Sequence, residues 1–141
     1  MSIQAILLPL FVEVALTLGL GIWLAMLRGR DFKSGAVQPS SIALREPNWP
    51  PRTLQAAYAF SNQFELPVLF YLLTILSIIT HHADLVFVVL AWVFVLSRLV
   101  QATVHVTSNV VHLRGTFFGI GALVLIAMWV IFMVRILLGL P

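Results

Sequence analysis

Hydrophobic residues occupy four long stretches of the chain, separated by shorter polar segments. The stretches run from about Ile3 to Leu27, Leu54 to Thr80, Leu85 to Val111, and Thr116 to Leu140. Each is longer than the ~20 residues that a helix needs to cross the hydrocarbon core of a bilayer. Because a backbone in lipid must satisfy its own hydrogen bonds, these stretches predict membrane-spanning helices. Pro67 lies inside the second stretch, and we expect it to kink that helix without ending it.

Composition supports the same interpretation. Of the 141 residues, 61% are hydrophobic and 9% are charged, whereas a soluble domain is about half apolar and a quarter charged. Four spans use most of the chain, so we predict a single all-α domain over residues 1–141, an integral membrane four-helix bundle. The chain has no cysteine, so thiol chemistry would need the thiol of a substrate. The eight Lys and Arg residues form no run, which speaks against nucleic acid as a partner.

The connections between the spans predict the orientation of the protein. The first connection, residues 28–52, is rich in Gly, Pro and Ser and carries five basic residues against Asp31 and Glu46. The second, residues 81–84, has no Lys or Arg, and the third carries Arg114. The positive-inside rule therefore places the first and third connections in the cytoplasm and both termini on the opposite side. In a bacterium, this multi-pass protein would lie in the inner membrane.

Polar residues within the second and third spans are concentrated on one side of each helix. Such residues are costly in a membrane, so their arrangement needs a reason. At about 100° per residue, those of the second span fall within an arc of roughly 80°, and those of the third within a similar arc. We call this set the polar stripe: Gln55, Tyr58, Asn62, Glu65, Arg98, Gln101, His105, Asn109 and His112.

Folding the second and third spans into an antiparallel hairpin brings the two halves of the polar stripe together. The short second connection then sets Glu65 opposite Arg98, Asn62 opposite Gln101, and Tyr58 opposite His105. The polar residues could simply hold the helices together. Alternatively, they form a hydrophilic pocket, open to the cytoplasm, for a polar and charged ligand, with an acid and a base that neutralise each other at depth.

Two short motifs extend this reading. Asn62-Gln63-Phe64-Glu65 is similar to the N-x-x-E motif of the MAPEG family, the membrane-associated proteins in eicosanoid and glutathione metabolism. Arg98, with Arg114 sixteen residues later, reproduces the spacing of two arginines in that family. Four spans, a long basic first loop and a tight second one complete the resemblance, which covers nearly the whole chain and is closest in type to uncharacterised bacterial members.

The resemblance implies a homotrimer that binds glutathione near the cytoplasmic side, between neighbouring subunits. Asn62, Glu65 and Arg98 match positions that bind glutathione in the family, and Arg114 matches the arginine credited with stabilising its thiolate. This assignment is chemically coherent, because carboxylates favour arginine, an ammonium favours Glu65, and a guanidinium beside sulfur favours the reactive thiolate. The implied reaction is conjugation or peroxide reduction, with lipophilic substrates that enter from the surrounding membrane lipid.

Further residues complete the predicted site. Gln101 suits the amides of glutathione, and Tyr58 and His105 lie on the same stripe. Arg28 or Arg30, at the end of the first helix, matches a further basic position of the family. No metal is predicted at His105 and its neighbours on the stripe, because no carboxylate or thiolate joins them at ligand spacing.

The chain also departs from the family pattern. Where the eicosanoid enzymes carry basic residues on the second helix, this chain has Tyr58, Phe60 and Ser61, and where some members have a tyrosine on the third helix it has His105. Fewer cations remain for the two carboxylates of glutathione, and the family also contains non-catalytic lipid-binding members. A non-catalytic protein that binds a lipid or a small molecule is therefore the main alternative.

Glu13 supports another alternative. A lone glutamate in the first of four spans also resembles the small multidrug-resistance transporters, in which such a carboxylate exchanges protons for cationic drugs. The long basic first loop and the polar stripe speak against that function. The simpler expectation is that Glu13 is protonated or hydrogen-bonded to another subunit.

Overall fold

The computed structural model describes all 141 residues and is entirely helical. Its α-helices are α1 (Ile3–Lys33), α2 (Pro51–Asn62), α3 (Leu66–Ile79), α4 (Leu85–Val106) and α5 (Val111–Leu138), and a short 3-10 helix, η1, covers Pro39–Ser41. Since α2 and α3 follow one another along a single span, four helical segments are long and apolar enough to cross a membrane. The predicted all-α, four-helix membrane fold is confirmed.

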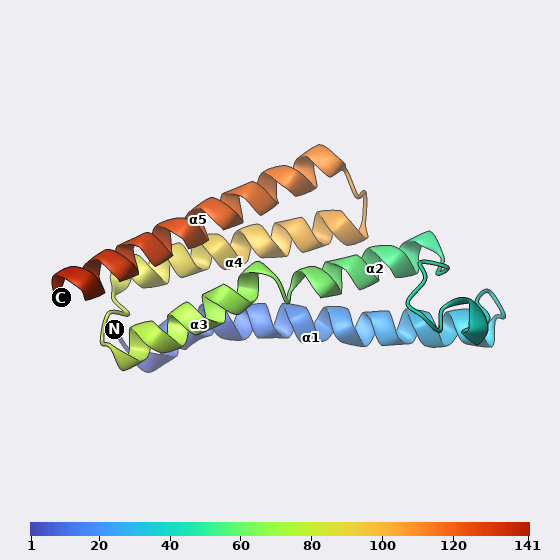
Figure 1. Ribbon diagram of the computed structural model, residues 1–141, viewed down its shortest axis with the longest axis horizontal. Helices are drawn as coiled ribbons and strands as arrows, with labels where there is room; N and C mark the ends of the chain where they lie inside the picture. The colour runs from blue at the N-terminus through green and yellow to red at the C-terminus, as the bar shows by residue number, and fades with distance from the viewer.

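Helix α4 lies at the centre of the bundle. It packs against α5, α1 and α2, while α3 packs against α1 and α5. The core lies where α3, α4 and α5 meet, and there the rings of Phe70 and Phe94, both completely buried, have centroids 4.9 Å apart. Large apolar side chains on the outer faces remain exposed, as expected of helices that contact lipid. Both termini and the α3–α4 turn lie at one end of the molecule, and the long loop lies at the other (Figure 1).

Helix α1 is longer than the sequence predicts. The first span was expected to end at Leu27, but the helix continues to Lys33. Its last turn carries Arg30 and Lys33, whose charges suit the negative end of the helix dipole. Asp31 accepts a hydrogen bond of 2.6 Å from the hydroxyl of Thr53, which joins the end of α1 to the start of α2. The predicted loop of residues 28–52 is thereby shortened to residues 34–50.

The second span is broken, so the expectation of a kinked but continuous helix is wrong. Helix α2 ends at Asn62, and Glu65, with φ −97° and ψ −106°, leaves the helical conformation before α3 begins. Pro67 has no N–H to donate, and its ring clashes with a helical carbonyl four residues back, that of Gln63. The last carbonyls of α2 are instead bonded by amides three residues later, which tightens its final turn. Figure 1 shows the interruption between α2 and α3.

The third span ends earlier than predicted, at Val106 instead of Val111. Asn109 adopts a positive φ of 50° and its N–H donates to the carbonyl of Val104 at 2.7 Å, which reverses the chain. Helix α5 accordingly starts at Val111, not at Thr116. Two residues assigned to the polar stripe are therefore not on the third span: Asn109 lies in the connecting loop, and His112 lies exposed in the first turn of α5.

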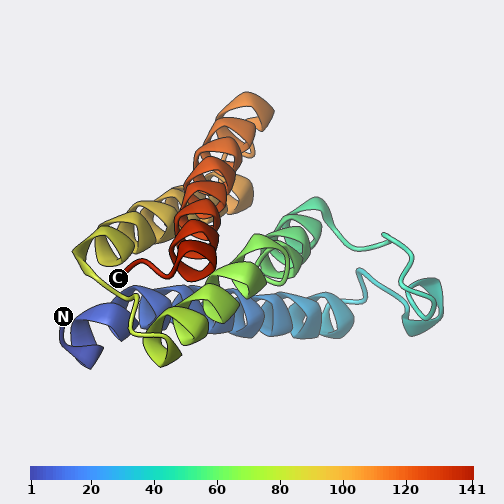
Figure 2. The same ribbon diagram turned by 60° about the vertical axis from the view of Figure 1, so that its left-hand side comes forward.

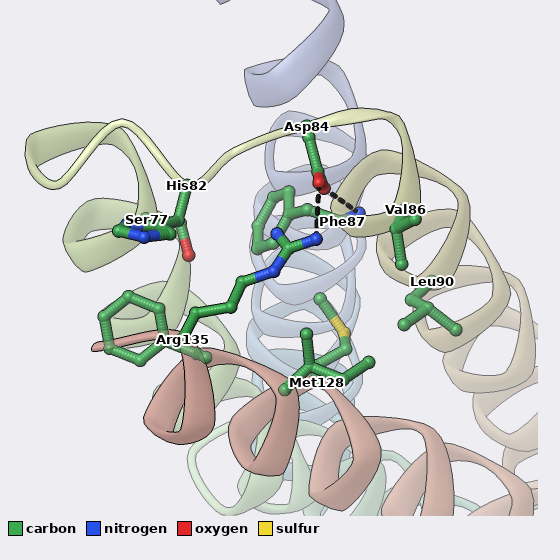
Figure 3. Close-up of a pocket in the computed structure, with 10 residues that line it drawn as sticks. Ser77, His82, Asp84, Val86, Phe87, Leu90, Met128 and Arg135 are labelled. Carbon is green, nitrogen blue, oxygen red and sulfur yellow. Dashed lines mark hydrogen bonds and ion pairs between the residues drawn. The ribbon is translucent and has the colours of Figure 1, made fainter. Parts of the chain in front are cut away.

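At the opposite end, polar contacts fasten the end of α5 to the α3–α4 turn (Figure 3). Asp84 caps α4 by accepting a hydrogen bond of 3.0 Å from the N–H of Phe87, and it forms a salt bridge of 2.8 Å with Arg135. His82 contacts the carbonyl of Leu140 at 2.9 Å through Nε2. Partial burial alone would raise the pKa of Asp84, but the hydrogen bonds from Arg135 and Phe87 outweigh it and lower that pKa below its usual value.

Candidate functional site

A polar cleft opens between α2, α4 and the first turns of α5. It forms because α5 diverges from α2 toward the loop end of the molecule, as both ribbon views show (Figures 1 and 2). The cleft has a volume of about 340 Å³, within the usual range of small-molecule sites. The residues that line it are Tyr58, Ser61, Asn62, Glu65, Gln101, His105, Arg114, Gly115 and Phe118.

Six of the eight residues predicted for the site line this cleft. They come from three helices and the α2–α3 break: Tyr58, Asn62, Glu65, Gln101, His105 and Arg114. Three further residues that line the cleft were not predicted for the site: Ser61, Gly115 and Phe118. The fourth span has no polar pattern that would have indicated the last two. Phe118 follows Arg114 by four residues, and therefore lies on the same face of α5. That spacing was the available signal.

Asn62 connects the carboxylate of the cleft to α4. With its amide nitrogen directed at Glu65, the orientation that satisfies its neighbours on both sides, it donates to the two carboxylate oxygens at 3.1 and 3.3 Å. Its side-chain oxygen then accepts a hydrogen bond of 2.8 Å from Nε2 of Gln101. The predicted pairing of Asn62 with Gln101 is confirmed. Glu65 is thereby held in position while its side chain remains exposed to the cleft.

Arg98 lies behind the cleft, not in it. Its side chain is completely buried, and Nη2 donates to the backbone carbonyl of Asn62 at 3.1 Å. The predicted ion pair between Arg98 and Glu65 is not formed, since the only salt bridge in the structure is that of Arg135 with Asp84. The α2–α3 break explains the difference, because it turns Glu65 toward the cleft and leaves a backbone carbonyl facing the guanidinium.

Two residues of α5 surround Arg98 on its other side. The ring of Phe118 lies 6.0 Å from the guanidinium carbon, at the edge of the range for a cation–π interaction. Gly121 permits the close approach of α5, since a Cβ there would lie 2.8 Å from the hydroxyl of Ser97 and 3.8 Å from Cδ of Arg98. Phe118 therefore contacts the cleft on one face and the buried arginine on the other.

Arg114 is the only arginine or lysine that lines the cleft. Its Nη1 donates to the side-chain oxygen of Asn109 at 2.7 Å, so the loop between α4 and α5 positions the guanidinium. The predicted stripe residue Asn109 thus holds the cation of the site in place. His105, buried on α4, lines the same cleft.

Arg28 does not reach this cleft. It stacks on Trp49, with the guanidinium carbon 5.0 Å from the ring centroid, and lines a separate cavity of about 700 Å³ beneath the long loop. That cavity and the cleft share Tyr58 and Ser61 as walls, so the two spaces adjoin. Within one subunit, Arg28 therefore lies apart from the other residues predicted for the site. The reason is that α1 directs it under the loop instead.

Glu13 is completely buried inside its own subunit. Neither carboxylate oxygen has a hydrogen-bond partner in the protein, and Thr17, one turn later, bonds only the backbone carbonyl of Glu13. The expectation that this acid is shared with another subunit is therefore wrong. The same burial disfavours the transporter alternative, because exchange of protons for a drug requires a carboxylate that the drug can reach.

Together these features define a class of protein: a four-span membrane helix bundle with a polar ligand cleft at one end. The cleft combines a carboxylate, amides and one guanidinium, a set suited to a zwitterionic ligand. A comparison with family models matches the MAPEG family over residues 6–134, nearly the whole chain, and this protein belongs to that family. A search of curated proteins and a search of solved structures each found no match. The family includes glutathione transferases, peroxidases and related proteins.

Proposed function

We propose that this protein is a membrane-embedded, glutathione-dependent transferase or peroxidase that acts on lipophilic substrates. The observation that carries the proposal is the arrangement of the cleft, where Glu65, held by Asn62, shares one space with Arg114. Glutathione offers an ammonium to Glu65, amides to Gln101, and an anionic group to Arg114. Membership of the MAPEG family makes glutathione the ligand to test first.

In this proposal, Arg114 acts on the sulfur. A guanidinium beside the thiol favours the thiolate, which is the nucleophile. In conjugation, the thiolate forms a carbon–sulfur bond, the leaving group departs with its electron pair, and the thiol proton passes to water at the mouth of the cleft. In peroxide reduction, the thiolate sulfur attacks the terminal peroxide oxygen and the O–O bond breaks. The other oxygen leaves with the electron pair and takes a proton from water to give the alcohol, while the sulfur becomes a sulfenic acid. A second glutathione then converts the sulfenic acid into a disulfide and water.

The small number of cations in the cleft limits how strongly it can bind the carboxylates of glutathione. Glutathione has two carboxylates, whereas Arg114 is the only arginine or lysine in the cleft and already donates to Asn109. Arg28 and Arg45 line the adjoining cavity and are the next cations available within the subunit. We propose that one carboxylate is directed toward that cavity across Tyr58 and Ser61, or toward a neighbouring subunit of the trimer. The shortage of cations favours weak binding, and it also supports the second candidate, a non-catalytic binding protein.

The experiment compares glutathione, whose thiol can ionise, with its thioether S-methylglutathione, whose sulfur cannot. Purified protein in detergent would be titrated with glutathione and with S-methylglutathione, which cannot ionise, and the thiolate would be followed by its ultraviolet absorbance. Turnover would be measured with chlorodinitrobenzene and with a fatty-acid hydroperoxide. In Arg114→Gln we expect the absorbance to disappear and turnover to fall at least a hundredfold, while S-methylglutathione binds nearly as before.

The matched control is Arg135→Gln, which removes an arginine at the opposite end of the bundle. It should leave thiolate absorbance and turnover unchanged. If wild-type protein binds glutathione with no thiolate absorbance and no turnover, the catalytic proposal fails and the non-catalytic binding protein remains. Unchanged turnover in Arg114→Gln would remove the assigned role of Arg114.

A further inference from the structure

A third cavity lies on the face of α1 that points away from Arg28. It has a volume of about 790 Å³ and is formed by the last turns of α1 and the first turn of α2. Three cations line it, Arg30 and Lys33 from α1 and Arg52 from α2. None of them forms a salt bridge, and all three are exposed. Of these residues, only Arg30 has an assignment above, as the alternative to Arg28 for a further basic position of the family.

The charge of the cavity is unbalanced. No acidic side chain lines it, and the nearest acid in the sequence, Asp31, is engaged by the hydroxyl of Thr53. The cavity thus gathers three of the eight basic residues of the chain and none of its five acidic residues. Three cations without an acidic partner around one space attract an anion, and the arginine guanidinium matches the geometry of phosphate and carboxylate groups.

The position of the cavity along α1 is that of a membrane interface. Helix α1 has 31 residues and is therefore ~46 Å long at ~1.5 Å per residue. Because the hydrocarbon core is only ~30 Å thick, the last turns of α1 extend into the headgroup region. Trp23 lies about two turns before Arg30, and its ring centroid is 5.6 Å from the guanidinium carbon of Arg52. Tryptophan is the residue typical of this depth.

Below the cations, the lining becomes apolar. Trp23, Met26 and Leu27 form that part of the wall, and Met26 is 67% exposed. The cavity therefore has cations at the headgroup level and an apolar surface toward the hydrocarbon core. A phospholipid has the same order of groups, an anionic headgroup followed by apolar acyl chains. A free anion would use the cations alone and would leave the apolar wall without a ligand.

We propose that this cavity binds an anionic phospholipid, with its phosphate held by Arg30, Lys33 and Arg52 and an acyl chain lying along Trp23 and Met26. The inference stands independently of the proposed glutathione chemistry, because the two sites share no lining residue. In the membrane, such a lipid fixes the depth of the basic end of the bundle. Each cation near the surface contributes about fivefold to the affinity for an anionic lipid.

The test uses delipidated full-length protein in detergent and native mass spectrometry. Dioleoylphosphatidylglycerol and dioleoylphosphatidylcholine would be added in parallel, and the dissociation constant of the first bound lipid would be measured. We expect a preference for phosphatidylglycerol that falls about a hundredfold when Arg30, Lys33 and Arg52 are all replaced by Gln. Arg45→Gln, which removes a loop cation outside the cavity, should preserve the preference. Thermal unfolding of the variants reports that they remain folded.

Two further measurements separate the possible anions. Quenching of tryptophan fluorescence by brominated phosphatidylglycerol should exceed that by brominated phosphatidylcholine, and Trp23→Phe should remove the excess. An equal preference in the triple variant and in wild type would overturn the proposal. Displacement of the lipid by millimolar inorganic phosphate would overturn it in favour of a soluble-anion site. Displacement by glutathione would overturn it by assigning these cations to the glutathione site.

Discussion

At the scale of single residues, Asn62 links two charged groups that do not touch each other. Its backbone carbonyl accepts from the buried Arg98, and its side chain bonds both Glu65 and Gln101. In an environment of low dielectric constant these polar groups need partners. Asn62 supplies one partner to each of Arg98, Glu65 and Gln101, while Nε and Nη1 of Arg98 and Oε1 of Gln101 have none within the subunit. Arg98 therefore contributes to the cleft through the position of Asn62, without lining the cleft itself.

Asp84 performs two functions that one substitution can separate. Asparagine caps helices as well as aspartate does, so Asp84→Asn retains the cap on the N–H of Phe87 but removes the charge that pairs with Arg135. The folded-state pKa of Asp84 is lowered from 3.8, so its pairing stabilises the fold above that pH and is lost as the pH falls through the folded value. Its side chain is 44% exposed, so solvent screening reduces the gain.

We therefore expect Asp84→Asn to cost ~0.5 kcal/mol at pH 7, or ~1–3 °C in the melting temperature of the detergent-solubilised protein. The difference from wild type should begin to shrink as the pH falls below the usual pKa of 3.8, and it should disappear below the lowered folded-state pKa of Asp84. Differential scanning fluorimetry at several pH values measures both. Glu46→Gln in the long loop is the matched control and should show no such dependence. A loss of equal size at pH 3 and pH 7 would contradict the assignment to charge pairing.

At the scale of elements, the two prolines within the spans have different consequences. Pro9 and Pro67 are both completely buried. Helix α1 nevertheless continues through Pro9, whereas the second span is interrupted just before Pro67, between the end of α2 at Asn62 and the start of α3 at Leu66. The difference lies in the surroundings, because the break at Pro67 is supplied with polar partners. Arg98 donates a hydrogen bond to the backbone carbonyl of Asn62, and the side-chain amide of Asn62 donates to the carboxylate of Glu65. An interrupted membrane helix is tolerated where its freed backbone groups find such partners.

Pro67→Ala should restore an N–H that can bond the carbonyl of Gln63 and thus favour a continuous helix. Glu65 would then leave its place in the cleft, and we expect the dissociation constant for glutathione to rise at least tenfold. Hydrogen exchange of the amide at position 67 reports the change in the helix without any ligand. Pro9→Ala, in which position 67 is still a proline without an amide hydrogen, is the control and should leave the affinity for glutathione unchanged. If Pro67→Ala shows slow exchange at position 67 but binds glutathione with unaltered affinity, the break between α2 and α3 is not required for binding.

The sequence predicts those parts of the fold that follow from the cost of polarity in lipid. The four spans and the pairing of Asn62 with Gln101 could be predicted, because apolar length and the clustering of polar residues are local signals. The contact of Arg98 could not, because it depends on where the break turns Glu65. The assignment of Asn109 to the third span failed for a similar reason: its positive φ, at the end of a helix, leaves no pattern in hydrophobicity.

In the whole molecule, the two ends of the bundle differ in the contacts and cavities that they contain. One end holds both termini and the Asp84–Arg135 salt bridge (Figures 1 and 3). The other end contains the polar cleft, the cavity of Arg28 and the cavity of Arg30. The positive-inside rule predicts that this second end faces the cytoplasm, where soluble glutathione would enter.

The trimer expected from the family is a prediction at this same scale. Native mass spectrometry of the protein released from mild detergent should give a mass of three 15.7 kDa chains plus any bound lipid. If glutathione bridges neighbouring subunits, it should slow dissociation of the trimer, and S-methylglutathione should do the same. A monomer that binds glutathione with the affinity of the membrane-extracted form would rule out a site shared between subunits.

Isothermal titration calorimetry measures whether the cleft around Glu65 binds glutathione. Wild-type protein in detergent should bind glutathione with a dissociation constant of millimolar or below. Glu65→Gln, which retains the hydrogen-bonding shape but removes the charge that pairs with the ammonium, should weaken binding by about tenfold. Glu46→Gln, outside the cleft, should not change it. No binding by wild-type protein at millimolar glutathione, or equal binding by Glu65→Gln, would show that Glu65 does not form part of a glutathione site.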